Sequence, residues 1–133
     1  MKTIILDTNF LLIPAQFKVD IFEEIKRIMT TPYKLRIMAK TIDELNNIIN
    51  NKSERKQTAK DKTAAKIALQ LIVKYKIVKI LSSKDLNVDN LILNTATKTS
   101  HIVATQDINL KRKLKEKRIP LIILRKKQYL ELQ

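Results

Sequence analysis

Four carboxylates stand out because each comes shortly after a short apolar run that is rich in β-branched residues. Asp7 directly follows the first run, Glu44 comes a few residues after the second, Asp89 lies just beyond the third, and Asp107 follows the fourth. In an open parallel sheet, the carboxyl ends of the strands lie along one edge, where such folds place their sites. We therefore expect these four acids to converge from separate parts of the chain.

Converging acids of this kind indicate a metal-assisted reaction. Packed together without a cation, carboxylates repel one another and raise one another's pKa values. A bound Mg²⁺ or Mn²⁺ would relieve this repulsion, because hard cations prefer carboxylate and water oxygens. Hydrolysis of a phosphodiester needs an activated water, an in-line approach and neutralisation of charge on the non-bridging oxygens, and one or two carboxylate-held metal ions provide all three.

Each acid also has a purely structural interpretation. Asp7 and Asp107 could accept hydrogen bonds from free backbone N–H groups after a strand, and Asp89 could favour a helix N-terminus through the helix dipole. Glu44 ends a segment, TIDE, that fits a capping box. The placement of all four acids on one predicted edge of a very basic protein favours the site. Two further acids near this edge remain as substitutes or helpers: Asp43 and Asp85.

Residue types that the sequence lacks exclude several other chemistries. The chain has no cysteine, which excludes disulfides and thiolate zinc sites. It also has no glycine, which both a P-loop and a dinucleotide-binding fingerprint require. The single histidine, His101, has no nearby serine or cysteine nucleophile with a convincing signature, so a hydrolase triad or a two-histidine zinc protease is not expected.

The charge balance indicates the partner. The 133 residues carry a formal net charge of +14, from 27 basic and 13 acidic side chains. Such a balance favours a polyanionic partner, with nucleic acid ahead of a membrane surface. The alternative is a lysine-rich composition that merely keeps the protein soluble. No apolar run approaches the ~20 residues that span a bilayer, and the acid at position 7 argues against a signal peptide, so we expect a cytoplasmic protein.

Hydrophobic periodicity predicts strands that alternate with helices over one domain, residues 1–133. Strands are predicted at residues 3–6, 35–38, 77–81, 101–105 and 121–124, and helices at 19–29, 42–49, 56–74, 88–97 and 110–117. The strands show little strict alternation, as expected when both faces of a sheet are buried. The predicted fold class is therefore α/β, a three-layer α/β/α sandwich with a central parallel sheet of about five strands.

Four segments of the chain resemble the motifs of PIN domains. They are ILDTNF at 5–10, TIDEL at 41–45, NVDNLI at 87–92, and IVATQD at 102–107 followed by LKRKL at 110–114. The last stretch, with IPLI at 119–122 after it, looks most like the Fcf-type PIN proteins of ribosomal RNA processing and their archaeal relatives. VapC toxins share the fold and the acidic set. The resemblance covers essentially the whole chain.

The resemblance implies a PIN-like fold and a Mg²⁺- or Mn²⁺-dependent endoribonuclease. It assigns catalysis and metal binding to Asp7, Glu44, Asp89 and Asp107, with Asn9 and Thr105 as polar supports. Two positions depart from the family pattern: the third motif often has two adjacent acids and here the second is Asn90, and the position before the last acid, often Asn, is Gln106. These departures affect the expected metal affinity and rate more than the reaction class.

Three basic tracts are candidates for holding RNA. They comprise Lys52, Arg55, Lys56, Lys60 and Lys62; Lys111, Arg112, Lys113, Lys115, Lys117 and Arg118; and Arg125, Lys126 and Lys127. Lys111 and Arg112 are the best candidates, because they closely follow Asp107. Aromatic residues make up only 5% of the chain, so phosphate-dominated, weakly sequence-specific binding is expected rather than extensive base stacking.

Other functions remain open at this stage. The main rival is a PIN-like RNA-binding or ribosome-assembly factor that cleaves weakly, and a VapC-type toxin with an antitoxin partner is the third reading. A haloacid-dehalogenase-type phosphatase would want a second acid two positions after Asp7, where this chain has Asn9. A membrane-surface protein would need a helix that joins a strong apolar face to aromatic anchors, and no predicted helix combines the two. The family resemblance also implies a homodimer.

Overall fold

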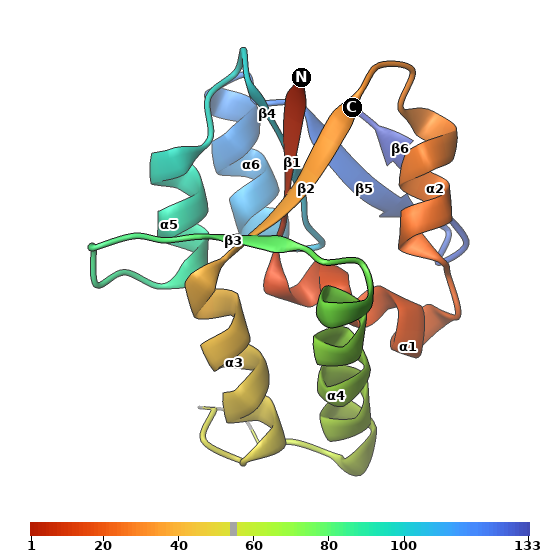
Figure 1. Ribbon diagram of the computed structural model, residues 1–133, viewed down its shortest axis with the longest axis vertical. Helices are drawn as coiled ribbons and strands as arrows, with labels where there is room; N and C mark the ends of the chain where they lie inside the picture. Colours follow the sequence, from red (N-terminus) through yellow and green to blue (C-terminus); the bar gives the residue numbers. More distant parts are fainter. Residues whose placement is uncertain (54–55) are drawn as a thin grey trace.

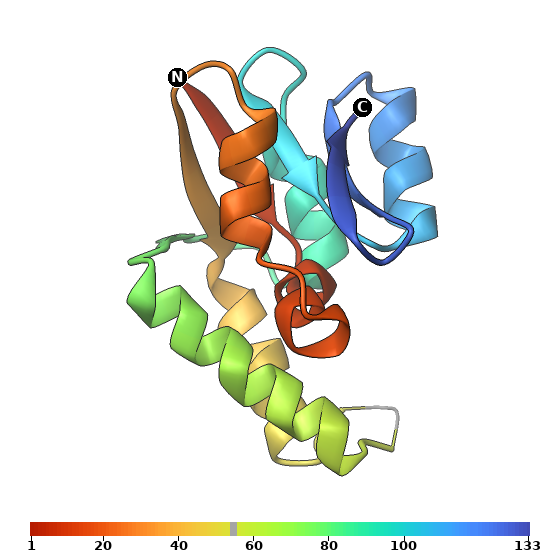
Figure 2. The same cartoon turned by 90° about the vertical axis from the view of Figure 1, so that its right-hand side faces the viewer.

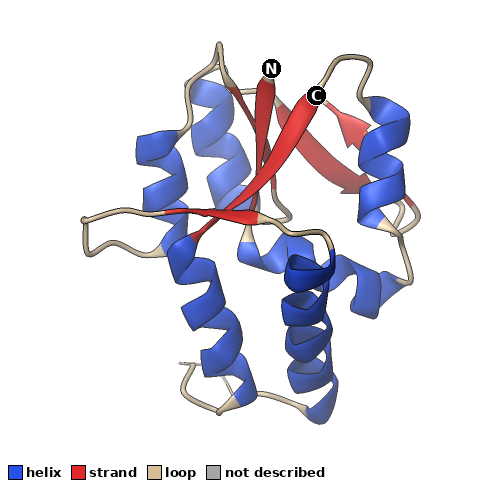
Figure 3. Cartoon of the chain, viewed as in Figure 1, coloured by secondary structure: helices blue, strands red, loops and turns tan. Residues whose placement is uncertain are grey.

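A twisted sheet forms the centre of the computed structural model, which describes residues 1–53 and 56–133 (Figures 1 and 3). In this part of the chain the sheet has six strands in the order β3-β2-β1-β4-β5-β6. The strands are β1 (Lys2–Leu6), β2 (Tyr33–Met38), β3 (Val78–Ile80), β4 (His101–Ala104), β5 (Leu121–Arg125) and β6 (Tyr129–Leu132). The helical segments are the 3₁₀ helix η1 (Thr8–Leu12), α1 (Ile13–Phe17), α2 (Ile21–Ile28), α3 (Ala39–Ile49), α4 (Ala59–Lys74), α5 (Val88–Thr95) and α6 (Ile108–Glu116).

The predicted three-layer sandwich is confirmed. Successive side chains of a strand point to opposite faces of the sheet, so Ile4 and Leu6 pack into one core while Ile5, between them, packs into the other. The first core lies under η1, α1, α2 and α4, and the second lies under α5 and α6. Figure 2 shows α2 and α6 on the two sides of the sheet.

Strand order places a crevice beside β1. The chain runs from β1 outward to β2 and β3, and then returns to β4 on the other side of β1. All four strands are parallel, so their carboxyl ends share one edge. Ligands in open α/β sheets bind where the strand order reverses in this way. The ends of β1 and β4 are therefore the place where the fold itself predicts a site.

Two helices extend beyond this edge of the sheet. Figure 1 shows α3 and α4 side by side below the strand ends. Helix α4 begins with a capping box, in which the Asp61 N–H donates to the Thr58 hydroxyl (3.1 Å) and the Thr58 N–H donates to the Asp61 carboxylate (2.9 Å). The helix predicted from residue 56 thus begins at Ala59, and Arg55 of the first basic tract lies outside the described residues.

Several elements differ from the prediction. No helix was predicted for the segment from η1 to α1, and no strand was predicted for β6, which is antiparallel to β5 at the end of the chain. Helix α3 begins at Ala39, with Met38 as an N-cap that uses no side chain, so the capping-box interpretation of Glu44 is wrong. Glu44 instead lies inside the helix, where its side chain is available to the crevice.

Positive backbone φ angles occur at six residues, none of them glycine. They are Lys18, Asn51, Lys76, Arg118, Lys126 and Lys127, with φ between 50° and 59°. Several follow helix ends, where a left-handed residue normally satisfies the last carbonyl groups and is usually glycine; Lys18 is the C-cap of α1. Among the described residues, no helix is long and apolar enough to cross a membrane.

Candidate active site

Asp7 lies at the centre of the crevice. It directly follows β1, and only 3% of its surface is exposed. Its carboxylate accepts a hydrogen bond from the Thr8 N–H (2.8 Å) and one from the Thr105 hydroxyl (2.6 Å). Burial raises the pKa of Asp7 to about 7, against the opposing effect of these hydrogen bonds, and repulsion from Asp89 and Glu44 adds to the rise. This acid is held in place and is coupled to two of the other acids.

Thr105 joins Asp7 to Asp107. Its hydroxyl donates to the Asp7 carboxylate and accepts from the Asp107 backbone N–H (3.0 Å), and the residue is fully buried. The Asp107 carboxylate in turn accepts from the Leu110 N–H (3.0 Å) as the N-cap of α6. The structural interpretation of Asp107 is thus confirmed, but a cap occupies only one carboxylate oxygen. Asp107 is also close enough to Asp89 to raise the pKa of that acid.

Glu44 reaches the crevice from α3. Its carboxylate accepts a hydrogen bond from the Thr8 hydroxyl at 2.6 Å, and the Thr8 hydroxyl oxygen lies 3.2 Å from that of Thr41. Thr8 therefore contacts two acids, through its N–H to Asp7 and through its hydroxyl to Glu44. The sequence analysis did not single out Thr8 or Thr41, although both lie within the motifs that it quoted.

Asp89 completes the cluster from the first turn of α5, a helix whose N-cap is Asn87. Burial raises the pKa of Asp89, and repulsion from Asp107 and Glu44 raises it further. The nearby Lys113 acts in the opposite direction. Each of the four predicted acids is thus close enough to at least one other to affect its ionisation. The structure brings together side chains from β1, α3, α5 and the start of α6.

The donor set fits a hard divalent cation. All four side chains offer carboxylate oxygens, the ligands that Mg²⁺ and Mn²⁺ prefer, and none forms a salt bridge with another described residue. As the side chains lie, no three described acidic or histidine residues form a ready-made metal cage. Mg²⁺ does not require such a cage, because it usually keeps several waters and is bound through one or two carboxylates.

Asn9 fixes the loop that carries Asp107. Its side-chain oxygen accepts from the Gln106 N–H (3.2 Å), while the Gln106 side-chain amide donates to the Asn9 carbonyl (2.9 Å). These two contacts connect η1 to the turn after β4. Gln106, at the position where the family often has Asn, therefore orients the turn between Thr105 and Asp107.

Two α6 cations, Lys111 and Lys113, interact electrostatically with the acids, and only the first of them was expected. Lys111 is half-buried, and burial together with repulsion from Lys115 and Arg125 lowers its pKa, while Asp107 opposes this change. Lys113 acts to lower the pKa of Asp89. Arg112, the other expected cation, is exposed. The helical period of 3.6 residues places it about 100° around the helix from Lys111, so the sequence could have shown that the two do not share a face.

Comparisons with known proteins agree on the fold. Residues 4–127 match the family described as "PIN like domain". Ribonuclease VapC4 from Methanocaldococcus jannaschii is 34% identical over 133 residues, a match that covers 99% of this chain and 97% of that protein. The structure of the PIN domain endonuclease Utp24 superposes with a TM-score of 0.74 at 21% identity, covering 98% of this chain and 90% of that one.

Proposed function

The chain belongs to the PIN-like domain family, and we propose that it is an endoribonuclease that hydrolyses RNA phosphodiester bonds with the help of Mg²⁺ or Mn²⁺. One observation carries the proposal: the four carboxylates come from separate elements at the edge where the strand order reverses, and none of them forms a salt bridge with another described residue, while burial and repulsion from the neighbouring acids raise the pKa values of Asp7 and Asp89. A 34% identical relative that is named a ribonuclease supports the same reaction class.

The acids would hold the metal, and their partners would orient them. Asp7, Glu44, Asp89 and Asp107 are the proposed metal-binding and catalytic side chains. When bound, a divalent ion would supply neutralisation of the phosphate and activation of a water molecule. Thr105 donates to one Asp7 oxygen and the Thr8 N–H donates to the other, so the two bonds would fix the orientation of this carboxylate. The Thr8 hydroxyl would orient Glu44 in the same way.

Basic side chains beside the crevice would bind the RNA backbone. Lys113 acts to lower the pKa of Asp89, and Asp107 acts to raise that of Lys111, which supports a role for both cations beside the proposed reaction centre. Arg112 is exposed one position further along the same helix and would contact phosphates outside the crevice. Phosphate contacts of this kind position a strand without reading its sequence.

The test is cleavage of a labelled RNA of mixed sequence by the purified protein. We expect cleavage with Mg²⁺ or Mn²⁺, no cleavage with EDTA, and recovery when excess metal is restored. An Asp7→Asn variant, purified in parallel, controls for a contaminating nuclease. Metal-independent cleavage, or equal cleavage by both proteins, would reject the proposal. Stable RNA binding without cleavage under any metal would favour the RNA-binding or ribosome-assembly factor instead.

The cellular role has a second candidate, a VapC-type toxin, which the name of the M. jannaschii relative favours. This role uses the same chemistry and adds an antitoxin as a protein partner. A small antitoxin gene beside the gene for this protein, and growth arrest on expression that the neighbour relieves, would support the toxin. Their absence would favour a role in ribosomal RNA processing.

A further inference from the structure

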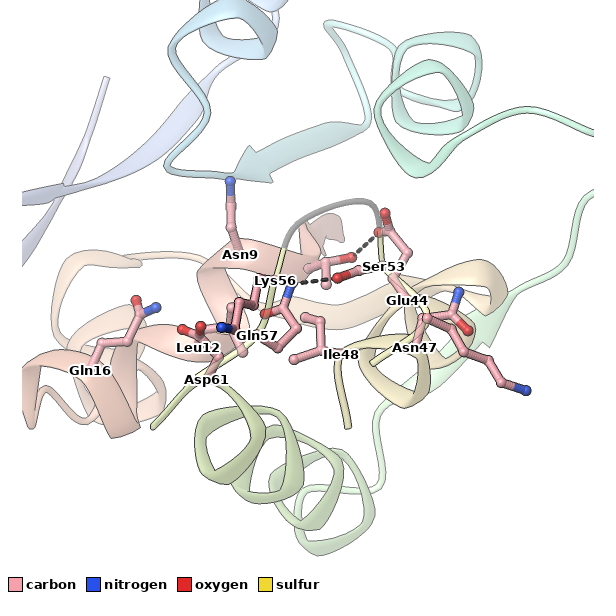
Figure 4. A pocket seen from close by; sticks show the side chains of 12 residues that line it. Asn9, Leu12, Gln16, Glu44, Asn47, Ile48, Ser53, Lys56, Gln57 and Asp61 are labelled. Atoms are coloured by element: carbon pink, nitrogen blue, oxygen red, sulfur yellow. Dashed lines mark hydrogen bonds between the residues drawn. The ribbon is translucent and has the colours of Figure 1, made fainter. Parts of the chain in front are cut away.

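A pocket of about 710 Å³ opens beside the acidic crevice (Figure 4). Its lining comes from η1 and α1, from α3, and from the segment that leads into α4. Three lining residues, Thr8, Asn9 and Glu44, also belong to the crevice or support it. The pocket is therefore continuous with the proposed reaction centre, and one ligand could extend from the crevice into the pocket.

The lining combines hydrogen-bonding amides with apolar side chains. Gln16 and Asn47 line the pocket and are exposed, and among the described residues their side-chain amides have no hydrogen-bond partner, so these amides are open to solvent or to a ligand. Figure 4 shows Gln16 at one end of the pocket and Asn47 at the other, near Glu44. Leu12 and Ile48 add apolar surface. Each amide offers both a donor and an acceptor, which is what the edge of a nucleobase requires.

Helix α3 aligns this pocket with the reaction centre. Glu44, Asn47 and Ile48 are spaced at i, i+3 and i+4, so they lie on one face of the helix. Glu44 faces the crevice through its contact with Thr8, and Asn47 and Ile48 continue the same face one turn further on. One helical turn therefore separates Glu44, at the proposed reaction centre, from the side-chain amide of Asn47 in the pocket.

Charged side chains of both signs line the pocket. Lys52 and Lys56 are exposed, and Glu44 and Asp61 contribute carboxylates. Glu44 lies at the end next to the reaction centre and Asp61 closes the capping box with Thr58, so the two lysines are the groups of the lining that can bind the phosphates of a nucleotide. The lining contains no aromatic side chain, so a bound base would be read at its edge more than by stacking.

We propose that this pocket binds one unpaired nucleobase of the RNA, next to the cleaved phosphodiester. The proposal rests on the ribonuclease function and adds a base-binding subsite to it: the base that enters the pocket must be unpaired, because a base in a duplex cannot enter it. Asn47 hydrogen-bonds to the base edge, Ile48 and Leu12 contact its face, and Lys52 and Lys56 bind the flanking phosphates.

Binding of a short RNA oligonucleotide in EDTA tests the pocket without cleavage. In a series of oligonucleotides, one nucleotide at a time is replaced by an abasic residue, which keeps every phosphate but removes the base. We expect one position at which loss of the base weakens binding by about 10-fold, the effect of one good side-chain contact to a base edge. Fluorescence anisotropy measures each dissociation constant.

Two variants assign that effect to the pocket. Asn47→Ala should weaken binding of the complete oligonucleotide by a similar factor, yet bind the abasic one as tightly as the wild-type protein does. Asn46→Ala is the matched control, because Asn46 is exposed on the same helix and does not line the pocket, and it should change neither constant. Equal weakening of both oligonucleotides by Asn47→Ala, or no sensitive position at all, would overturn the proposal.

The outcome is separable from that of the cleavage assay. A protein that shows the abasic effect but never cleaves RNA would retain the pocket and lose the nuclease function. A protein that cleaves RNA but binds every abasic oligonucleotide like the complete one would retain the nuclease function and lose the pocket. The second result would leave the pocket to a different occupant, such as a segment of a protein partner.

Discussion

The crevice between β1 and β4 and the pocket beside α3 share three residues, yet they are built in opposite ways. In the crevice, the polar side chains contact one another: Thr105 joins Asp7 to the Asp107 backbone, and Thr8 joins Asp7 to Glu44. In the pocket, Gln57 donates to Ser53, but the exposed amides of Gln16 and Asn47 have no partner among the described residues. The crevice acids are thus held by hydrogen bonds within the protein, whereas the pocket keeps two amides open to a ligand.

This difference indicates how the two regions divide the work. A reaction centre benefits when its groups are held in place before the substrate arrives, because no reorganisation is then needed during the reaction. A recognition site must satisfy groups on the substrate, so unpaired donors and acceptors are useful there. Substitutions in the crevice should therefore alter rate and stability together, whereas substitutions in the pocket should alter RNA binding and leave stability unchanged.

The largest effect is expected from removing a crevice acid. Asp7→Asn and Asp107→Asn should each reduce the cleavage rate at saturating metal by at least ~100-fold, since each removes a charge that would hold the metal against the phosphate. Asp43→Asn, an exposed acid on the same helix as Glu44, should remain near the wild-type rate. Cleavage by Asp7→Asn at the wild-type rate would show that the reaction occurs elsewhere.

Thr105→Val tests whether the crevice depends on its internal hydrogen bonds. Valine has nearly the same shape but leaves the Asp107 N–H and one Asp7 oxygen without their partner. We expect a loss of about 1–3 kcal/mol in the free energy of unfolding, along with slower cleavage. Asn47→Ala should change stability by less than about 0.5 kcal/mol. Denaturant titrations of both variants compare the two regions directly, and equal losses would abolish the contrast.

Metal binding should stabilise the crevice and leave the pocket unaffected. A divalent ion at ten times its dissociation constant adds about 1.4 kcal/mol of stability, which raises the melting temperature of a domain of this size by roughly 3–6 °C. Asp107→Asn should reduce this rise because a ligand is lost, while Asn47→Ala should keep it. Thermal melts with EDTA and with Mg²⁺ at constant ionic strength measure both effects.

The metal-free melt of Asp107→Asn separates a ligand from a structural cap. Asparagine is as good an N-cap as aspartate, so the helix contact with Leu110 can persist, and removing a repulsive charge should maintain or raise the stability of the metal-free protein. A variant that is less stable with and without metal, and responds to Mg²⁺ as the wild type does, would mean that Asp107 is only a cap.

The smallest effect on RNA binding is expected from replacing the cations around the crevice and the pocket. With about five phosphate contacts on a single strand, the logarithm of the RNA affinity should fall with the logarithm of salt concentration with a slope near −3.5. Replacing Lys52 and Lys56 together by Ala should flatten the slope by about 1.4, and so should replacing Lys111 and Arg112. Lys66→Ala, on an exposed part of α4, should not. A slope that only one pair changes would confine the RNA to one side of the crevice.

The sequence predicted the elements that carry strong patterns. Five strands and five helices were found at or near their predicted positions, because apolar runs buried on both faces and helical apolar stripes leave clear signals. The four acids were found together because parallel strands end on one edge, a rule that needs no side-chain geometry. Asn9 and Thr105 were chosen from the family resemblance, and the structure places both beside the acids.

Features that depend on contacts between distant residues were missed. β6 has one buried apolar residue, Leu130, whose backbone is held by Glu24 and Arg27 of α2, more than a hundred positions earlier. η1 has Asp7 as its N-cap, and its five residues show no apolar periodicity from which a helix could be predicted. The two roles of Thr8 likewise require the distance between β1 and α3, which no local pattern contains.

Six of the described residues have a left-handed backbone conformation, in a sequence of 133 residues that contains no glycine. A left-handed conformation costs a residue with a β-carbon about 1–2 kcal/mol, so the cost for six such residues is on the order of 10 kcal/mol. That sum is comparable to the whole net stability of an ordinary domain. Five of the six are lysine or arginine, the residues that give this chain its charge. At these five positions the chain carries a positive charge where glycine would adopt the same conformation with less strain.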